Sequence, residues 1–282
     1  MCIRDRPNLG TAIYTVTPTA NGCSGTPLNI TVTVNPAPAP QINDGVICVN
    51  QATGVSYKNY ILDTNLSNAM YDFAWYYNGV IINGATNTSY EATQAGIYSV
   101  EVTNTATGCK SVLTQADVVA SFPGTSVSTT ETLAFSDNTI ITVDVTGGNA
   151  TFLYSLDNGP TQSSNVFTDV SPGPHVVTVT DSNGCTYLTQ LVTIIGYPTY
   201  FTPNGDGYHE TWNIVGLGAT AKVFIFDRYG KLIKQISPTG EGWDGTLNGQ
   251  PLMSSDYWFT VDYKEPQTGE SKVFRSHFSL KR

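Results

Sequence analysis

The chain has 282 residues, of which 40% are apolar and 12% are charged, and its formal net charge at pH 7 is −9. Ordinary globular proteins are about 25% charged, and an acidic balance argues against nucleic acid or an anionic membrane as a partner, because both attract clustered Lys and Arg. No run approaches the ~20 apolar residues of a membrane helix. Tyr and Phe are frequent and Met is rare, which favours strands and turns. We therefore predict an all-β protein without a transmembrane segment.

Met1–Arg6 differs in character from everything that follows it. The hexamer contains Arg4 and Arg6, and the next arginine in the chain is Arg228. It resembles an in-frame translation of a sequencing-adapter end, so we predict an artefact at residues 1–6 and a chain that is the C-terminal piece of a longer reading frame. The alternative is a short native N-terminus. The hexamer lacks the apolar segment of a signal peptide.

Charge divides the chain close to residue 196. Residues 7–196 contain two basic and twelve acidic residues, whereas residues 197–282 contain nine of each. A change this abrupt indicates a boundary between modules of different kinds. Five segments are predicted after the hexamer: a truncated sandwich end at 7–35, a Pro-rich linker at 36–40, a complete sandwich at 41–121, a second sandwich at 122–196 and a C-terminal module at 197–282.

One pattern occurs three times before the C-terminal module: a strand, a polar turn that ends in Gly-Cys, and another strand. The turns end at Cys23, Cys109 and Cys185. Within each copy, β-branched and aromatic residues alternate with polar ones, as in strands with one buried face. Glycine in the turn allows the positive φ of a tight hairpin. Short strands with regular turn signals predict tandem β-sandwiches of the immunoglobulin-like kind.

The complete sandwich contains Cys48, Trp75 and Cys109. It resembles the immunoglobulin-like and PKD-like modules of bacterial surface proteins, and in immunoglobulin-like sandwiches a cysteine pair bridges two sheets and a Trp packs against it. The resemblance implies a disulfide between Cys48 and Cys109. Cys23 would have lost its partner with the missing part of its sandwich, and Cys185 is expected to be unpaired. The alternative, reduced thiols in a cytosolic protein, is less favoured because metal-binding thiols cluster and these do not.

The second sandwich has the sequence features of another kind of repeat. These are Gly147-Gly148, Phe152–Asp157 and the Val177–Cys185 ending. They resemble the repeats of large gliding-motility adhesins, and this resemblance implies a further β-sandwich of a surface protein.

The C-terminal module is predicted to consist of strands and turns. Residues 223–226 and 232–236 flank the turn Asp227–Gly230, in which Gly occupies the position of positive φ. Two further strands flank the turn Glu265–Glu270. Alternation gives each of these two strands one apolar face, formed by Tyr257, Phe259, Val261 and Tyr263 on the first and by Phe274, Phe278 and Leu280 on the second. A small β-sandwich is expected.

Six motifs follow one another through this module, and the printed sequence closes with His277–Arg282 (HFSLKR). The motifs are Tyr200–Gly207 (YFTPNGDG), Trp212–Ile214 (WNI), Phe226–Gly230 (FDRYG), Gly242–Gly245 (GWDG), Asn248-Gly249 (NG) and Asp256–Phe259 (DYWF). Together they resemble the gliding-motility-associated C-terminal domain, the type B sorting signal of the type IX secretion system of Bacteroidota. One departure is His209-Glu210, where that family usually has Asn-Asp.

The resemblance implies export. Such proteins cross the inner membrane by a cleaved N-terminal signal, and the outer-membrane translocon then recognises the folded C-terminal domain, so that the cargo reaches the cell surface or the medium. The expected sorting-signal residues are Pro203, Asn204, Gly205, Asp206, Gly207, Trp212, Asp227, Arg228, Tyr229, Gly230, Trp243, Asp244, Gly245, Lys281 and Arg282. The alternative for each is a structural role, in which Gly, Asn and Asp shape turns and the aromatic residues fill the core.

Catalytic and cofactor motifs are absent from the sequence. His175, His209 and His277 belong to different modules or motifs, and none has a second His or Cys at metal-ligand spacing. No nucleophile elbow, P-loop or dinucleotide-binding glycine pattern occurs. Asn204, Asp206 and Glu210 superficially resemble part of a calcium loop, but the complete run of ligands with its distant Glu is absent. We predict no enzyme activity, no cofactor and no metal.

Three functions remain open. In the first, the chain is the tail of a secreted or surface adhesin-like protein of a Gram-negative bacterium, with stalk modules and a domain that binds the type IX translocon; surface glycans and other cells are candidate targets. In the second, the modules carry a secreted enzyme whose catalytic domain is missing. In the third, one sandwich binds carbohydrate through Tyr76, Tyr77 or Tyr90, although core packing explains these residues better. Serial, acidic repeats favour the adhesin.

Overall fold

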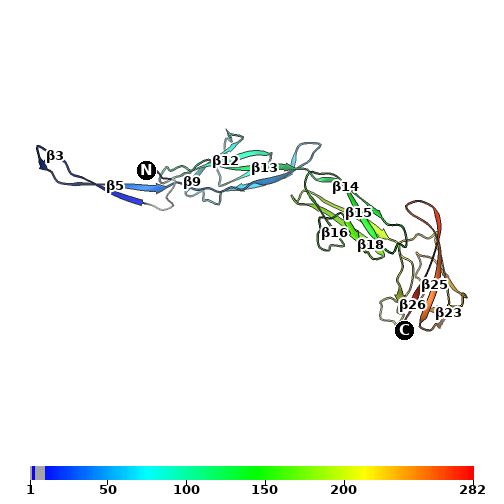
Figure 1. Cartoon of the computed structure of the whole chain (residues 1–282). Coiled ribbons are helices and arrows are strands. Elements are labelled where there is room, and N and C mark those ends of the chain that lie inside the picture. The colour runs from blue at the N-terminus through cyan, green and yellow to red at the C-terminus, as the bar shows by residue number, and fades with distance from the viewer. Residues whose placement is uncertain (1, 4–9) are drawn as a thin grey trace. The chain divides into compact units, whose positions relative to one another are not determined.

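The structure is a computed structural model that describes residues 2–3 and 10–282 (Figure 1). All regular elements in this part of the chain are β-strands, which confirms the predicted fold class. The predicted adapter artefact lies outside the described residues, except for Cys2 and Ile3. The chain forms two compact units, Met1–Pro123 and Gly124–Arg282.

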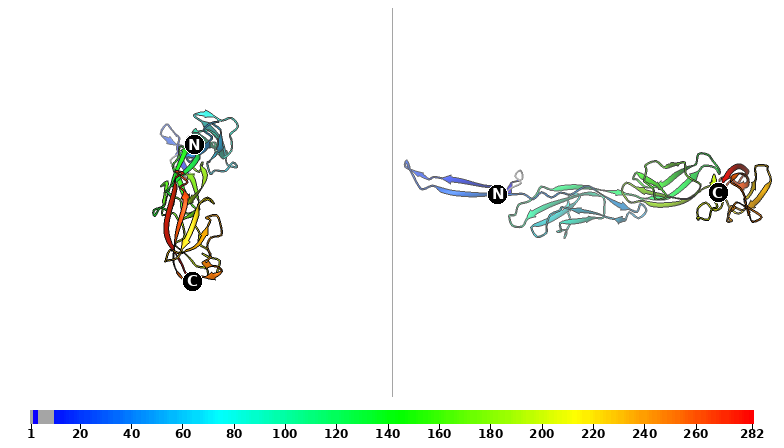
Figure 2. Two further views of the ribbon diagram at one scale, coloured as in Figure 1. Left: turned by 90° about the vertical axis from the view of Figure 1, so that its right-hand side faces the viewer. Right: turned by 90° about the horizontal axis from the view of Figure 1, so that it is seen from below.

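The first unit begins with a hairpin whose apolar side chains are exposed. β2 (Gly10–Val16) pairs antiparallel with β5 (Leu28–Pro36), and Figure 2 shows them as long, neighbouring blue strands. Ile13 is 65% exposed and Leu28 is 64% exposed, so the hairpin buries little apolar surface. Such a hairpin is only marginally stable by itself. Three short strands accompany it: β1 (Cys2–Ile3), β3 (Thr19–Ala20) and β4 (Cys23–Ser24).

The rest of the first unit is a β-sandwich built around Trp75. Its strands are β6 (Gly45–Val49), β7 (Ser56–Lys58), β8 (Tyr60–Asp63), β9 (Tyr71–Tyr77), β10 (Val80–Ile81), β11 (Ser89–Ala92), β12 (Gly96–Asn104) and β13 (Thr114–Ser121). Six of them form one sheet in the order β10-β9-β12-β13-β6-β7, and β8 pairs with β11. Leu62 of β8 and Ala92 of β11 pack into the core of the large sheet. Trp75 is fully buried, and its indole N–H donates to the Asn87 carbonyl at 2.8 Å.

The strand register does not support the predicted pairing of Cys48 with Cys109. Cys48 lies in β6 opposite Ser121, beyond the end of β12 that begins at Gly96. Cys109 follows the other end of β12, where its carbonyl accepts the Asn104 N–H at 2.9 Å. About 11 residue positions, roughly 35 Å at the rise of a strand, separate them along the sheet, whereas a disulfide requires Cα atoms within about 7 Å.

The cysteines at positions 23, 48, 109 and 185 differ in state. Cys48, Cys109 and Cys185 are buried and disulfide-bonded. Cys23 is exposed and free. The expectation that Cys185 is unpaired is therefore corrected. The resemblance to immunoglobulin domains implied a pair of cysteines on facing strands of two sheets. Cys48 and Cys109 instead lie at opposite ends of one sheet.

The second unit contains two hydrophobic cores, and the first belongs to a sandwich of two three-stranded sheets. The sheets are β14-β15-β17 and β16-β18-β19. Ile141 of β15 and Val177 of β18 are fully buried in this core. The strands are β14 (Gly124–Glu131), β15 (Ile140–Gly147), β16 (Phe152–Leu156), β17 (Val166–Thr168), β18 (Gly173–Asp181) and β19 (Tyr187–Ile194). Figure 1 shows β14, β15, β16 and β18 gathered in this module.

The C-terminal core lies on one face of a five-stranded sheet, in the order β20-β26-β25-β21-β22. The strands are β20 (Tyr200–Phe201), β21 (Lys222–Phe226), β22 (Leu232–Ile236), β25 (Ser255–Lys264) and β26 (Ser271–Leu280), and a small ribbon is formed by β23 (Thr246–Leu247) and β24 (Gln250–Pro251). Both predicted hairpin turns are confirmed, between β21 and β22 and between β25 and β26. Figure 2 shows β25 and β26, in orange and red, side by side.

Alternation along β25 and β26 places the predicted apolar residues toward the core. Phe259 and Val261 of β25 and Phe278 of β26 are at most 1% exposed. The other face of this core comes from irregular segments rather than a second large sheet. Trp212 and Trp243, both in long connections, are fully buried there. The sheet therefore fixes one layer, and loops that carry motif residues form the other.

Candidate functional site

The loops that carry the predicted sorting motif meet at the end of β26. Arg282 donates from Nη1 to the Pro203 carbonyl at 3.1 Å and from Nη2 to the Gly245 carbonyl at 3.2 Å. Its Nε donates to the Leu252 carbonyl at 3.1 Å, and its backbone N–H donates to Ser254 Oγ at 3.0 Å. A guanidinium presents its donors in a rigid fork. One side chain thus joins the Pro203 loop to both ends of the segment 245–252, which is distant from that loop in the sequence.

Lys281 anchors the neighbouring strand. Its backbone N–H donates to the Phe201 carbonyl at 3.1 Å, next to the parallel pairing of β20 with β26. Its Nζ lies 4.5 Å from the centre of the Tyr200 ring, a cation–π contact. Lys281 and Arg282 therefore hold the strand and the loops in one arrangement.

The Pro203–Gly207 loop is shaped by its own side chains. Asn204 Oδ1 accepts the Asp206 N–H at 3.0 Å, and Asp206 Oδ1 accepts the Tyr208 N–H at 2.8 Å. Hydrogen bonds from Tyr208 and Asn204 hold the pKa of Asp206 below its usual range. Glu210 Oε1 accepts the Gly207 N–H at 3.0 Å. These carboxylates are occupied in turn formation, so the loop presents a fixed backbone to solvent.

Trp212 and Trp243 act in the core and not on the surface. Their backbones pair in both directions, at 2.9 and 2.8 Å. The Trp212 ring stacks on Phe278 with centroids 3.7 Å apart and an angle of 9°. The indole N–H groups donate to the carbonyls of Pro198 at 2.7 Å and Thr246 at 2.8 Å. Since both side chains are fully buried, a partner protein cannot touch them, and they support the loops from beneath.

The turn at Asp244-Gly245 lies directly on Arg282. Asp244 Oδ1 accepts the Thr246 N–H at 3.1 Å and its Oγ1 hydroxyl at 2.9 Å. Burial raises the pKa of Asp244, but these hydrogen bonds outweigh it and leave the pKa below its ordinary value. Gly245 has a φ of +77°, and a Cβ there would lie 3.0 Å from Arg282 Nη2. Only glycine fits both the backbone and the contact.

The turn at Asp227–Gly230 presents the most exposed aromatic residue of the motif. Asp227 Oδ1 accepts the N–H groups of Tyr229 at 2.8 Å and Lys231 at 2.9 Å. Tyr229 is 85% exposed, and the Arg228 guanidinium lies 5.6 Å from the centre of its ring. A hollow of about 280 Å³ lies between this turn and residues 251–257. The same stretch contacts Arg282, so the turn adjoins the loop cluster.

These segments form one surface, which we call the loop face: residues 203–208, 227–230, 244–245, 252–254 and 281–282. Of the predicted motif residues, only Trp212 and Trp243 lie outside it, in the core. Two exposed residues on it were not predicted, Tyr208 and Met253, each 76% exposed. The sequence could have indicated their exposure, because both residues lie next to turns rich in glycine or proline, and a large apolar residue in a turn is not directed into a core.

The segment that carries most of these motifs matches a known protein family. Residues 195–276 match the CHU_C Type IX secretion signal domain. This module is a type IX secretion signal domain. The match confirms the predicted resemblance and indicates export to the cell surface or secretion. It ends before Lys281, so the contacts of Lys281 and Arg282 come from the structure alone.

The chain is also similar to several solved structures, at low sequence identity. One is Sidekick-1 immunoglobulin domains 1–5, with 12% identity, coverage of 96% of this chain and 66% of that chain, and a TM-score of 0.31. Another is SGBP-B of the Bacteroides ovatus mixed-linkage glucan utilization locus, in complex with a mixed-linkage heptasaccharide, with 13% identity, coverage of 96% and 70%, and a TM-score of 0.21. Chicken CNTN1 FN1–FN3 has 12% identity, coverage of 87% and 100%, and a TM-score of 0.22. A comparison with curated proteins finds no match.

The described residues contain no constellation of metal ligands. No group of three or more His, Cys, Asp or Glu is placed to hold a metal ion within residues 2–3 and 10–282. Nor does this described part hold a helix of the length and hydropathy needed to cross a membrane. Tyr77 and Tyr90, candidates for carbohydrate contact, are half-buried and pack against Tyr98 at 5.0 and 5.7 Å. Their arrangement is that of a core cluster.

Proposed function

We propose that the chain is the C-terminal part of a surface adhesin-like protein. Its acidic β-modules form a solvated stalk, and its signal domain delivers the protein to the outer surface by binding the type IX translocon. The observation that carries this proposal is the loop face, in which Arg282 holds two motif segments, at Pro203 and at Gly245, together with Leu252 at the end of one folded sheet. A translocon that reads folded cargo needs side chains in fixed positions.

Exposed, rigidly held aromatic residues and methionine are typical of binding surfaces. Tyr, Trp, Met and Arg are enriched in the cores of protein interfaces, and Tyr is frequent among the residues that dominate affinity. The loop face presents Tyr208, Tyr229 and Met253 on ordered turns, with Arg228 beside Tyr229. We propose that these side chains contact the translocon and that Trp212 and Trp243 only support them.

Export by the signal domain is tested with a reporter. A signal peptide and a fluorescent protein would precede residues 124–282, expressed in a host with a type IX system and in the same host without the translocon. The proposal expects reporter at the surface or in the medium only in the first host. Reporter retained in the periplasm of both hosts would contradict it.

The role of the loop face is tested by two variants in the same reporter, Tyr229→Ala and Met253→Ala. Both side chains are largely exposed, so the fold is expected to be unaffected. Export should fall about tenfold or more if each contributes as a dominant interface residue, which is worth about 2 kcal/mol. The control is Tyr187→Ala in β19, where the Tyr is 74% exposed outside the signal domain. An equal effect of all three variants would sink the assignment.

The adhesin and the alternative, a spacer and sorting tail of a secreted enzyme, differ in what lies upstream. Residues 7–196 carry two basic and twelve acidic residues, and this like charge favours an extended, soluble stalk. Further repeats of the same kind in the longer reading frame, together with binding of the purified chain to cells or glycans, would support the adhesin. A catalytic domain upstream would refute it in favour of the enzyme.

A further inference from the structure

A loop of the preceding sandwich inserts an aromatic ring into the signal domain. Phe135, between β14 and β15, stacks on Phe274 of β26 with centroids 4.3 Å apart and an angle of 6°. It meets Tyr263 edge-on at 5.3 Å and an angle of 83°, and lies 6.3 Å from Tyr197. We call the three residues that surround Phe135 the aromatic cup: Tyr197, Tyr263 and Phe274.

Polar contacts close around the same ring. Gln267, in the turn between β25 and β26, donates from Nε2 to the Glu131 carbonyl at 2.6 Å. The Ala134 N–H donates to Glu265 Oε1 at 3.4 Å, and Lys272 Nζ lies 3.6 Å from Glu265 Oε2. Glu265 is only 1% exposed. Burial of a carboxylate without partners is unfavourable. Glu265 has one partner from the sandwich, the Ala134 N–H, and one from the signal domain, Lys272.

The backbone of Phe135 points to the same conclusion. Its φ is +60°, in the left-handed region that a bulky residue rarely adopts. Such a conformation is unfavourable for a bulky residue and persists only when the surroundings determine it. The Phe135 N–H is also held, donating to the Ile195 carbonyl at 3.3 Å. The loop is thus shaped so that its ring enters the cup.

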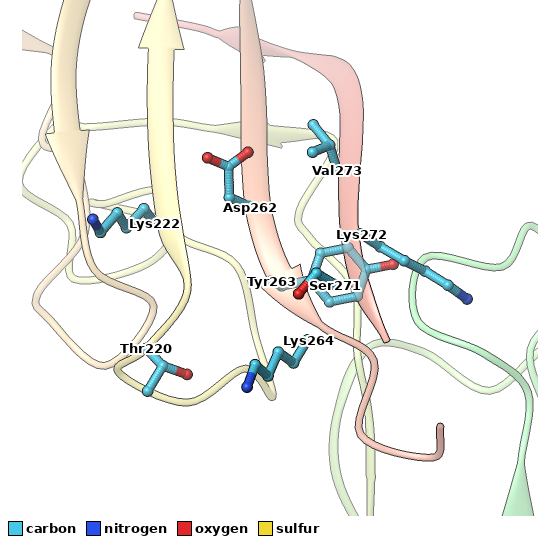
Figure 3. Close-up of a pocket in the computed structure, with 8 residues that line it drawn as sticks. All are labelled: Thr220, Lys222, Asp262, Tyr263, Lys264, Ser271, Lys272 and Val273. Carbon is cyan, nitrogen blue, oxygen red and sulfur yellow. The ribbon is translucent and has the colours of Figure 1, made fainter. Parts of the chain in front are cut away.

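The side chains at this end of the β25–β26 hairpin do not form an anion-binding site. A hollow of about 410 Å³ is lined there by Lys222, Lys264 and Lys272. Figure 3 shows Lys272 pointing to the opposite side from Lys222 and Lys264, so the three ammonium groups do not converge on one anion. Lys272 instead extends to Glu265.

We propose that the aromatic cup is a binding site for the 131–137 loop of the same chain. The loop is an intramolecular ligand, the sandwich at 124–196 is the partner that completes the signal domain, and the β25–β26 hairpin depends on this contact for its order. The unit that folds together is then residues 124–282, and not residues 197–282 alone. This inference concerns folding and does not depend on the proposed export.

The test is amide hydrogen exchange of the full chain, with Phe135→Asn as the principal variant. Asn tolerates the left-handed conformation, so the substitution removes the ring without adding backbone strain. The probes are the N–H groups of Glu265 and Gly269, which bond within the hairpin turn at 2.8 and 2.7 Å. Their exchange should be about threefold to tenfold faster, as expected for the loss of one aromatic pair.

Two further variants keep the result interpretable. Leu133→Ala changes an exposed residue of the same loop and should leave the hairpin probes unchanged. Gln267→Ala removes the contact from the opposite side and should accelerate them as Phe135→Asn does. The Val143 N–H, in the core sheet of the sandwich, is the internal reference. Unchanged hairpin exchange in Phe135→Asn, or equal acceleration at Val143 and the hairpin, would overturn the proposal.

Discussion

His209 occupies a backbone conformation better suited to asparagine. Its φ is +53°, and among non-glycine residues Asn and Asp accept this region most readily. The related sorting domains that the sequence resembles usually have Asn at this position. The His209 ring lies 5.4 Å from the Tyr200 ring, which offsets part of the strain. At position 209 the backbone conformation therefore favours Asn, whereas the contact with the Tyr200 ring favours His.

We predict that His209→Asn stabilises the signal domain. The free energy of unfolding should rise by about 0.5–1 kcal/mol, because Asn relieves part of the left-handed strain. Urea denaturation followed by Trp fluorescence measures the change. His277→Asn in the extended strand β26 is the control and should give no gain. A decrease for His209→Asn would mean that the contact with Tyr200 outweighs the backbone preference.

At the scale of elements, the end of β26 determines how the covering loops are held. Arg282→Lys keeps the charge but loses the forked geometry that reaches the carbonyls of Pro203, Gly245 and Leu252. We predict a loss of about 1–2 kcal/mol in the free energy of unfolding, since hydrogen bonds from a charged group are worth more than neutral ones. Arg275→Lys, in the same strand, is the control. Equal effects of the two substitutions on the urea midpoint would exclude a special role for Arg282.

Much of the element order could be predicted because strands and turns leave local signals. Alternation along β25 and glycine in the Asp227–Gly230 turn were sufficient for both hairpins. The docking of Phe135 could not be predicted, because a half-buried ring in a loop has no periodicity and its partner Phe274 is far away in the sequence. The loop face was predicted as a set of motifs, but its assembly by Arg282 depends on tertiary contacts alone.

At the scale of the whole molecule, carboxyl groups make the second unit sensitive to acid. Four aspartates there have a pKa below the ordinary value of 3.8: Asp157, Asp181, Asp206 and Asp244. For Asp157 the main cause is the hydrogen bond with His175, at 2.6 Å. For Asp181, burial raises the pKa but hydrogen bonds outweigh it. Each group contributes stability that is present above its unfolded pKa and is lost as the pH falls through its folded pKa.

We predict that the free energy of unfolding of the second unit decreases below about pH 4, where these aspartates take up protons more readily in the unfolded chain. Denaturation at pH 7 and pH 3 measures this change. Asp157→Asn should reduce the difference between the two pH values, whereas Asp144→Asn, an exposed position in β15, should not. An identical pH dependence in Asp157→Asn and the unsubstituted chain would contradict the assignment.

Across the whole molecule, local sequence patterns predicted the β-sandwich modules, whereas the spacing of cysteines did not predict their pairing. The alternation and turn residues of each module predict β-sandwiches, because these properties act within a few residues. The pairing of Cys48 depends on which strands are neighbours and in which direction they run, and β6 lies parallel to β13. No local pattern in the sequence encodes that neighbour.

The position of β26 between β20 and β25 has a consequence for biosynthesis. The strand that joins the two halves of the sheet is made last among them, so a chain interrupted before Ser271 leaves β20 without its partner and Phe201 and Phe259 without Phe278. A product that ends before Ser271 would therefore lack the loop face in the arrangement described above. The sheet of the signal domain therefore closes only when β26 pairs with both β20 and β25.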